Sequence, residues 1–437
     1  MKMVDMVIIG GGPAGLSAAI RAYELGIRDI LVIERNDFLG GILNQCIHNG
    51  FGLHIFGEEL TGPEYAARLA EKVEELGIPY LLGAMVMDIR GERRVTVLSQ
   101  NGMEEIMAKT VILAMGCRER PRGAVNIPGD RPSGIFLAGT AQELVNLHGY
   151  RIGHEAVILG SGDIGLIMAR RLTYEGVKVK CVLEIMPYSG GLKRNIVQCL
   201  EDYQIPLRLR STVIHIVGRK RLKGVMIAGV DDNRQPIPGT EEFISCDTLL
   251  LSVGLIPENE LTKNAGAAIS KVTGGALVDN GMQTSVPGIF ACGNVLHIHD
   301  LADHVTLEAY EAAENAVKYL NGQTREKSAP VIPTTAGEGI RYVVPQLIDV
   351  AKLTDKLDLK LRTNEVRQFA HIVVRMTDGN EIKRQKKRIV TPGEMETLTL
   401  KGAELDMIRT AKTVTVSVEG DADGGAKEVV EGGMDGK

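Results

Sequence analysis

The fold of this 437-residue chain is decided by the stretch VDMVIIGGGPAG at residues 4–15, which joins an apolar run to a glycine-rich turn. Residues 4–9 have the composition of a buried β-strand, and the turn leads into a helix whose apolar residues recur at helical spacing until Gly26. A second apolar run at residues 30–33 ends at Glu34. This order presents backbone N–H groups to a pyrophosphate and a carboxylate to a ribose, so it predicts a dinucleotide-binding fold.

The same order of elements returns later in the chain. An apolar run at residues 156–159 leads into GSGDIG at residues 160–165, and a further run at residues 177–183 ends at Glu184. In both copies the acidic residue follows the last glycine of the turn by 19 positions, since 34 − 15 and 184 − 165 are equal. One glycine turn is a weak signal, but two copies in the same context predict two dinucleotide-binding folds in one chain.

Composition narrows the class of protein. The chain is 44% hydrophobic and 24% charged, as globular enzymes are. It has no Trp, few aromatic residues and a net charge of −5, which argues against nucleic acid as a partner. No window approaches the ~20 apolar residues of a membrane span, and the first strand begins too close to Met1 for a signal or transit peptide. We therefore expect a cytoplasmic protein.

A third motif, TSVPGIFACGN at residues 284–294, extends the pattern. Together with the two turns it resembles the two-dinucleotide flavoprotein superfamily that includes disulfide reductases and NADH oxidases, over about residues 4–320. The resemblance implies that the first fold binds FAD and that the second is inserted and binds the nicotinamide cofactor. The family normally ends the third motif in Asp; Asn294 can still hydrogen-bond a ribityl hydroxyl but carries no charge.

We therefore expect an α/β fold with two Rossmann-like domains, the NAD(H) domain inserted into the FAD domain, and a small β-rich C-terminal domain. The expected boundaries are residues 1–121 and 247–325 for the FAD domain, 122–246 for the NAD(H) domain, 334–420 for the β-rich domain and 421–437 for a disordered tail.

The motifs assign site residues to each cofactor. For FAD we expect Gly10, Gly12, Pro13, Ala14, Gly15, Glu34, Arg35, Gly41, Ala114, Gly116, Gly293, Asn294, His304 and Val305. For NAD(H) we expect Gly160, Gly162, Asp163, Ile164, Gly165, Glu184 and Gly254.

Two further expectations concern these cofactors. Glu184 would repel a 2′-phosphate, so NADH is favoured over NADPH, although Lys193 and Arg194 keep NADPH open. Family geometry also implies that a helix over residues 304–320 points its N-terminus at the flavin N1/C2=O edge and stabilises the anionic reduced flavin. The mechanism would be hydride transfer between nicotinamide C4 and flavin N5.

The six cysteines, at positions 46, 117, 181, 199, 246 and 292, contain no CxxC pair. Disulfide reduction and a cysteine-ligated iron–sulfur cluster within the chain are therefore disfavoured. Cys46 lies in the loop that in this superfamily usually passes the flavin ring. It is our candidate catalytic residue, as a thiol that exchanges with the flavin; the alternative is a small packed side chain.

Histidines crowd two segments. His297, His299 and His304 suggest a metal, but no nearby Cys or carboxylate set completes a site, so we expect no metal and assign these residues to packing or flavin contacts. His48 and His54 flank the glycines of a flavin loop, where they contact the ring or pack the loop.

A closer likeness rests on GGILNQCIHNGFGLH at residues 40–54, AMGCRER at residues 114–120 and SVGLIPEN at residues 252–259. These segments are similar to flavoprotein subunits of multi-subunit dehydrogenases, especially those encoded beside an anaerobic glycerol-3-phosphate dehydrogenase, and more distantly to FAD/NAD subunits of opine, proline and hydroxyproline dehydrogenases. The likeness implies an oligomer with a partner flavoprotein dehydrogenase. Any iron–sulfur cluster would lie on a small partner subunit, because no cysteine follows Cys292.

Three functions remain open. The chain is the electron-transfer subunit of a glycerol-3-phosphate or amino-acid dehydrogenase, a stand-alone NADH oxidase or NADH:acceptor reductase, or a structural FAD subunit that docks partners through residues 330–420. The basic run at residues 383–388 is either a solvated hairpin arm or a docking patch for an acidic partner.

Overall fold

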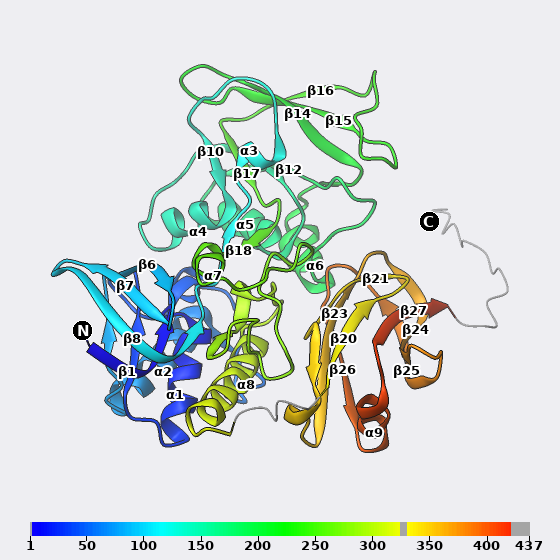
Figure 1. The fold of residues 1–437 in the computed structure, drawn as a ribbon. Coiled ribbons are helices and arrows are strands. Elements are labelled where there is room, and N and C mark those ends of the chain that lie inside the picture. Colours follow the sequence, from blue (N-terminus) through cyan, green and yellow to red (C-terminus); the bar gives the residue numbers. More distant parts are fainter. Residues whose placement is uncertain (1, 324–329, 421–437) are drawn as a thin grey trace. The chain divides into compact units, whose positions relative to one another are not determined.

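The computed structural model describes residues 2–323 and 330–420 (Figure 1). The chain divides into two compact units, Met1–Glu326 and Lys327–Lys437. The tail at residues 421–437, which the sequence predicts to be disordered, lies outside the described residues. Within the described ranges, no helix combines the length and the apolar character that crossing a bilayer requires.

The first unit begins with a seven-stranded sheet in the order β5-β2-β1-β8-β7-β6, with β19 paired to β8. β1 is parallel to both β2 and β8, and the late strand β19 returns to lie parallel to β8. The chain therefore completes its first fold only after the second has been inserted. The strands are β1 (Lys2–Ile9), β2 (Ile30–Ile33), β5 (Tyr80–Leu81), β6 (Met85–Arg90), β7 (Arg94–Ser99), β8 (Gly102–Leu113) and β19 (Ile289–Ala291).

Helices α1 (Pro13–Glu24), α2 (Gly62–Glu75) and α8 (Ala302–Leu320) belong to this fold. Pro13 at the first helical position of α1 has the φ that a helix requires, and small buried residues on α1 let it pack closely against α8. The Arg21 guanidinium on α1 pairs with the Glu314 carboxylate on α8 at 2.6 Å. Two helices that are far apart in the sequence therefore pack against each other next to the first glycine turn.

The second fold has a five-stranded parallel sheet in the order β10-β17-β11-β12-β13. Helices pack on one face and an antiparallel three-stranded sheet packs on the other, so the central strands are buried on both faces. The parallel strands are β10 (Ile135–Leu137), β11 (Glu155–Leu159), β12 (Lys178–Leu183), β13 (Leu207–Arg208) and β17 (Thr248–Leu251), and the helices are α4 (Ala138–Asn146), α5 (Asp163–Tyr174) and α6 (Lys193–Cys199).

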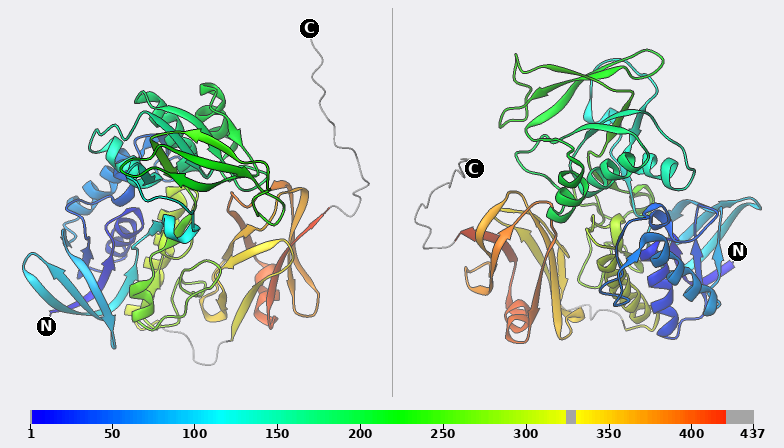
Figure 2. Two further views of the ribbon diagram at one scale, coloured as in Figure 1. Left: turned by 90° about the horizontal axis from the view of Figure 1, so that it is seen from above. Right: turned by 180° about the vertical axis from the view of Figure 1, so that it is seen from behind.

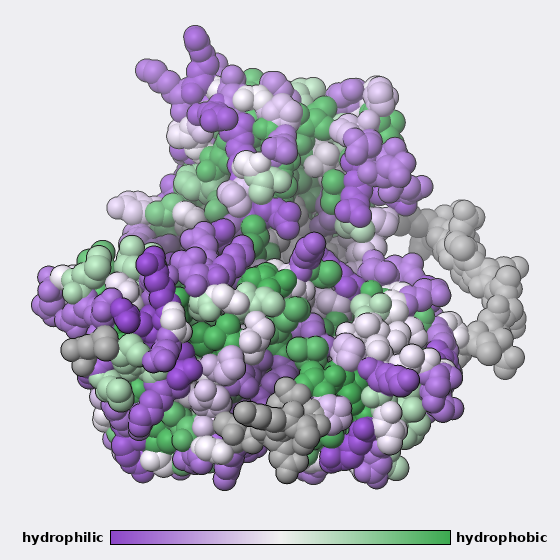
Figure 3. Space-filling model, in the orientation of Figure 1, coloured by the Kyte–Doolittle hydropathy of each residue, from purple (hydrophilic) through white to green (hydrophobic). Residues whose placement is uncertain are grey.

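The small sheet of this fold consists of β14 (Ser211–Val217), β15 (Gly224–Gly229) and β16 (Glu242–Ser245). In Figure 3 hydrophilic residues mark its outer end, over the turns that join the three strands. Two short strands, β9 (Cys117–Glu119) and β18 (Leu255–Pro257), pair antiparallel where the chain passes between the two folds.

The second unit is β-rich, as expected, and packs two sheets, β22-β20-β27-β24-β25 and β21-β23-β26, around one apolar core (Figure 2). The one α-helix among its described residues, α9 (Ala403–Thr410), closes one end. The strands are β20 (Val331–Ala336), β21 (Ile340–Val344), β22 (Leu347–Asp349), β23 (Lys356–Thr363), β24 (Arg367–Met376), β25 (Glu381–Val390), β26 (Glu396–Lys401) and β27 (Val414–Gly420).

The basic run at residues 383–388 forms most of β25, an edge strand that pairs only with β24 among the described strands. Three of its basic residues have carboxylate partners within the same unit: Lys383 pairs with Glu404 at 3.1 Å, Arg384 with Glu419 at 2.8 Å and Lys387 with Glu396 at 2.6 Å. Neutralised basic residues on an edge strand suit a solvated hairpin arm better than a docking patch.

Candidate dinucleotide-binding sites

The first glycine turn combines close packing with open space. A Cβ at Gly15 would collide with the Gly10 carbonyl oxygen, and Gly10 itself has a φ of +108°, which L side chains rarely adopt. By contrast, the nearest atom to a Cβ at Gly12 would be Gly41 Cα at 3.9 Å. Gly10 and Gly15 therefore set the turn, whereas Gly12 leaves room at the N-terminus of α1 for a ligand phosphate.

The second turn repeats this division of roles. A Cβ at Gly165 would lie 2.5 Å from the Gly160 carbonyl oxygen, whereas a Cβ at Gly162 would have no atom within 4 Å. Asp163 Oδ1 accepts hydrogen bonds from Leu192 N at 2.8 Å and Asn195 Nδ2 at 2.6 Å, which ties the turn to α6. Ile164 packs partly buried against the core of this fold.

The acidic residue of each copy folds back onto its own turn. Glu34 Oε2 accepts a hydrogen bond from Gly11 N at 2.6 Å. Glu184 Oε2 accepts from Ser161 N at 3.0 Å, which is the equivalent position of the second turn. Both carboxylates are buried at the C-terminal ends of their strands, where the general geometry of these folds places a ribose.

Most of the predicted FAD residues meet at the first turn. A Cβ at Gly41 would lie 3.0 Å from Gly12 Cα, and one at Gly293 would lie 2.9 Å from Ala14 Cβ and 3.2 Å from Val305. Ala114 N donates to Ile9 O at 2.9 Å, directly beside the turn. Other predicted residues lie elsewhere: Arg35 is exposed, Gly116 O accepts from Glu258 N at 3.0 Å, and Asn294 Oδ1 accepts from His299 N at 3.0 Å.

A buried carboxylate stands at the N-terminus of α8, which begins two residues before the expected position 304. Asp303 is 3% exposed, and its Oδ2 accepts from His54 N at 3.2 Å. Its Oδ1 has no hydrogen-bond donor within the described part of the chain. The site therefore offers an open acceptor to a ligand with an N–H group, such as the N3–H of a flavin ring, and in this respect the residues fit FAD.

Sequence reasoning missed Asp303, because its partners come from distant segments. The rings of His54 and His304 stack with centroids 6.0 Å apart above it. Below it, the Tyr65 hydroxyl and Thr306 Oγ1 lie 2.7 Å apart, and burial raises the pKa of Tyr65 above its usual range. These contacts place polar side chains on both sides of Asp303 along α8 and from two distant segments.

Residues 4–318 match the pyridine nucleotide-disulphide oxidoreductase family. The chain belongs to this family. It is 28% identical over 325 residues to thioredoxin reductase of Listeria monocytogenes, and this alignment covers 73% of this chain and 94% of the relative. It is 26% identical over 284 residues, 60% of the chain, to hydrogen cyanide synthase subunit HcnB of Pseudomonas protegens, of which it spans only 59%.

A solved structure shows the same fold. Thioredoxin reductase from Lactococcus lactis superposes with a TM-score of 0.59 at 23% identity, over 73% of this chain and 99% of that one. The fold class is confirmed, with two Rossmann-like domains and an additional β-rich region. This member of the family is an FAD-dependent oxidoreductase whose second cofactor is a nicotinamide dinucleotide.

Cys46 follows the short helix η1 (Gly41–Gln45) in the loop beside the first turn. Its Sγ lies 3.4 Å from Ile42 O and 3.8 Å from Gln142 Oε1, and burial raises the pKa of the thiol to about 12. The thiolate is the reactive form of cysteine. The surroundings of Cys46 therefore favour a packed neutral thiol over the predicted redox role, which no contact tests directly.

The same loop ties the two folds together, which sequence reasoning did not anticipate. Gln45 Nε2 donates to Gly139 O at 2.9 Å and Asn146 Nδ2 donates to Gln45 O at 2.8 Å, so both ends of α4 hold this loop. Glu119 Oε1 accepts from Gly139 N at 2.8 Å, and burial raises the pKa of this carboxyl.

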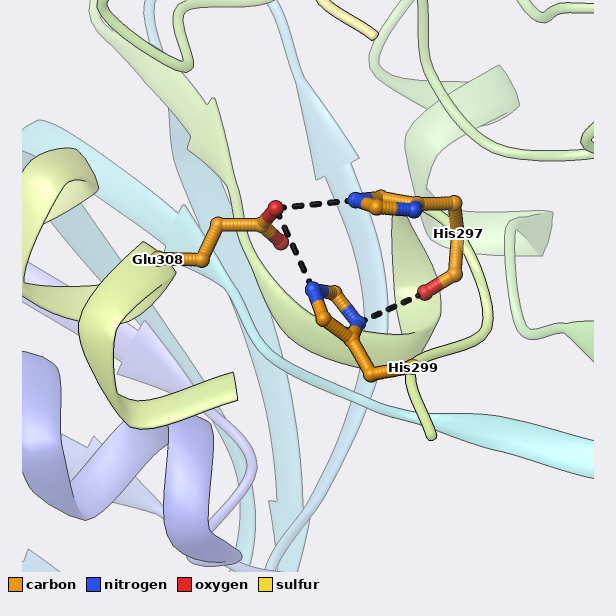
Figure 4. Close-up of side chains that lie close together, drawn as sticks. All are labelled: His297, His299 and Glu308. Atoms are coloured by element: carbon orange, nitrogen blue, oxygen red, sulfur yellow. Dashed lines mark hydrogen bonds and ion pairs between the residues drawn. The ribbon is translucent and has the colours of Figure 1, made fainter. Parts of the chain in front are cut away.

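The histidines are arranged differently from the expectation. His297 and His299 converge on the buried carboxylate of Glu308, whereas His304 lies apart against His54 (Figure 4). The statement that no carboxylate completes the histidine group is therefore wrong. Glu308 was missed because α8 turns back over the loop and brings a residue 11 positions away into contact.

His48 has its pKa lowered to about 4 by burial and by the nearby Arg170 and Arg194 guanidinium groups.

Replacing Cys46 by Ser should leave flavin reduction nearly unchanged. Because the thiol is neutral near pH 7, removing it takes away no nucleophile. We expect the Cys46→Ser variant to be reduced by NADH within about twofold of the wild-type rate in anaerobic stopped-flow measurements. A loss of tenfold or more, with FAD content unchanged, would instead assign Cys46 a redox role.

Replacing Asp303 by Asn should raise the flavin midpoint potential. A buried carboxylate disfavours an anionic reduced flavin, and the amide removes the charge while keeping an acceptor. We expect a shift of roughly +30 mV, about 1.4 kcal/mol for two electrons. A potentiometric titration of Asp303→Asn against the exposed control Glu59→Gln measures it; equal potentials in both variants contradict the assignment.

Proposed function

We propose that this chain exchanges hydride between NAD(H) and FAD, and exchanges electrons with a partner flavoprotein in a glycerol-3-phosphate or amino-acid dehydrogenase. One observation carries this proposal: the chain has two dinucleotide turns but no redox cysteine pair. None of the six cysteines, all of which lie in the described part of the chain, forms a disulfide, and no two are spaced as CxxC. With no internal disulfide to reduce, electrons on the flavin need a donor or acceptor outside the chain.

The cysteine environments support the same conclusion. Burial raises the pKa of Cys117 to about 11, that of Cys181 to about 11 and that of Cys246 to about 12. Thiols of this kind are neutral near pH 7 and react slowly in disulfide exchange. The members of the family named as disulfide reductases therefore share the fold of this chain, and we assign it a different acceptor.

The first turn is proposed to hold the FAD pyrophosphate over Gly12, with Glu34 on the ribose and Asn294 on the ribityl chain. The second is proposed to hold the NAD(H) pyrophosphate over Gly162, with Glu184 on the ribose. When bound, the two dinucleotides supply the hydride chemistry, and the protein positions them and excludes water. The domain boundaries given above remain predictions on the same basis.

Glu184 supports NADH over NADPH. Its two carboxylate oxygens accept from Ser161 N at 3.0 Å and Met186 N at 2.9 Å, which holds a negative charge where a 2′-phosphate would have to bind. Arg194, one of the two residues that kept NADPH open, is turned toward the first fold: its guanidinium lies 3.1 Å from the position of a Cβ at Gly50.

The likeness to HcnB supports a partner. HcnB is named as a subunit of hydrogen cyanide synthase, so a relative of this chain works within an assembly. The motifs at residues 40–54, 114–120 and 252–259 resemble the flavoprotein subunit associated with anaerobic glycerol-3-phosphate dehydrogenase. An iron–sulfur cluster, where the assembly has one, would lie on a separate subunit.

Oxygen reactivity tests the proposal. We expect the purified chain alone to be reduced rapidly by NADH, yet to turn over with oxygen at least about a hundredfold more slowly than it is reduced, because its physiological acceptor is a partner. Parallel measurement of flavin bleaching and oxygen uptake gives both rates.

Two matched variants control this test. Gly162→Ala adds a methyl group to the open space of the second turn and should slow reduction by NADH while dithionite still bleaches the flavin. Gly420→Ala, which also has no atom within 4 Å but lies in the second unit, should behave as wild type. Sustained oxygen turnover as fast as reduction would establish a stand-alone NADH oxidase instead.

A further inference from the structure

His297, His299 and Glu308 form a buried group, here called the His–Glu cluster, to which the proposed dinucleotide sites assign no role. Their side chains are 1%, 1% and 0% exposed. Figure 4 shows both imidazole rings turned toward the carboxylate, the histidines coming from the loop after β19 and Glu308 from α8. Glu308 Oε2 lies 2.9 Å from His297 Nε2 and 3.3 Å from His299 Nε2.

The hydrogen bond at Nδ1 of His299 turns the other ring nitrogen, Nε2, toward the Glu308 carboxylate. His299 Nδ1 lies 2.9 Å from the His297 carbonyl oxygen, which can only accept a hydrogen bond, so Nδ1 carries the proton. In a neutral ring, Nε2 then presents its lone pair to the Glu308 oxygen at 3.3 Å. Two acceptors facing each other in a buried site repel unless a positive charge lies between them.

We propose that the His–Glu cluster binds a divalent transition-metal ion, with His297 Nε2, His299 Nε2 and Glu308 Oε2 as ligands. Two imidazoles and one carboxylate are a ligand set that suits Zn²⁺ and neighbouring divalent ions. In a tetrahedral zinc site with bonds of about 2.0–2.1 Å, ligand atoms stand roughly 3.3 Å apart. The two nitrogen–oxygen separations, 2.9 and 3.3 Å, are close to this value, and all three ligand atoms lie within 4.8 Å of one another.

The hydrogen bonds around the ligands are those that orient metal-binding groups. A ligating histidine usually donates its second ring N–H to a carbonyl or carboxylate, as His299 does to His297 O. Glu308 Oε1 accepts from Gly293 N at 2.8 Å, which leaves Oε2 to face the rings. The ion would therefore fasten the third glycine motif, through Gly293, to α8 and stiffen the FAD side of the first fold.

Metal content of the full-length, FAD-bound protein tests the site. The protein is loaded with Zn²⁺, dialysed, and measured for all first-row transition metals by mass spectrometry. We expect about one ion per wild-type chain and a loss of tenfold or more in His299→Gln and Glu308→Gln, because each removes one ligand. His215→Gln, an exposed histidine on β14, is the matched control and should keep the ion.

If the ligand variants do not fold, Co²⁺ loading of the wild-type protein decides the question, because a tetrahedral histidine–carboxylate site gives d–d absorption at wavelengths beyond the flavin band. Wild-type protein that holds less than about a tenth of an ion per chain, or ligand variants that keep as much metal as His215→Gln, would overturn the proposal.

Discussion

The structure depends on the close approach of two backbone segments at each glycine turn. At Gly15 and at Gly165 the helix backbone lies so near the carbonyl oxygen of the first turn glycine that no side chain fits between them. Because the strand and helix are held this tightly, the helix N-terminus faces the space left open by Gly12 or Gly162. This space suits a phosphate, because the N-terminus of the helix carries a positive partial charge and presents backbone N–H groups.

The remaining site residues follow from this constraint. Glu34 and Glu184 each bind the backbone N–H of the second turn residue, which fixes a carboxylate beside the phosphate position. On the FAD side, Glu308 and Asn294 hold the third motif against α8 and the following loop. The cysteines agree with this arrangement, because burial raises the pKa of Cys46, Cys117, Cys181 and Cys246 and keeps these thiols neutral near pH 7.

The presence of two dinucleotide-binding folds could be predicted from the sequence, because the spacing of residues along the chain determines it. In each copy a strand leads into a six-residue turn and a helix, and a carboxylate follows the last glycine of the turn by 19 positions. This order leaves little freedom in how the backbone folds. The positions of Asp303 and Glu308 could not be predicted in the same way. Asp303 contacts His54 from 249 positions away, and Glu308 meets His297 only because a loop folds back on α8. Local periodicity carries no information about such contacts, and the ties between Gln45 and α4 were missed for the same reason.

The most direct test is anaerobic mixing of the FAD-bound protein with NADH and, separately, with NADPH, while the flavin absorption band is followed. We expect rapid bleaching by NADH and bleaching at least about tenfold slower by NADPH, because the Glu184 carboxylate opposes a 2′-phosphate. Bleaching by NADPH as fast as by NADH would contradict the role of Glu184. No bleaching by either nucleotide would contradict the assignment of the second turn to the nicotinamide cofactor.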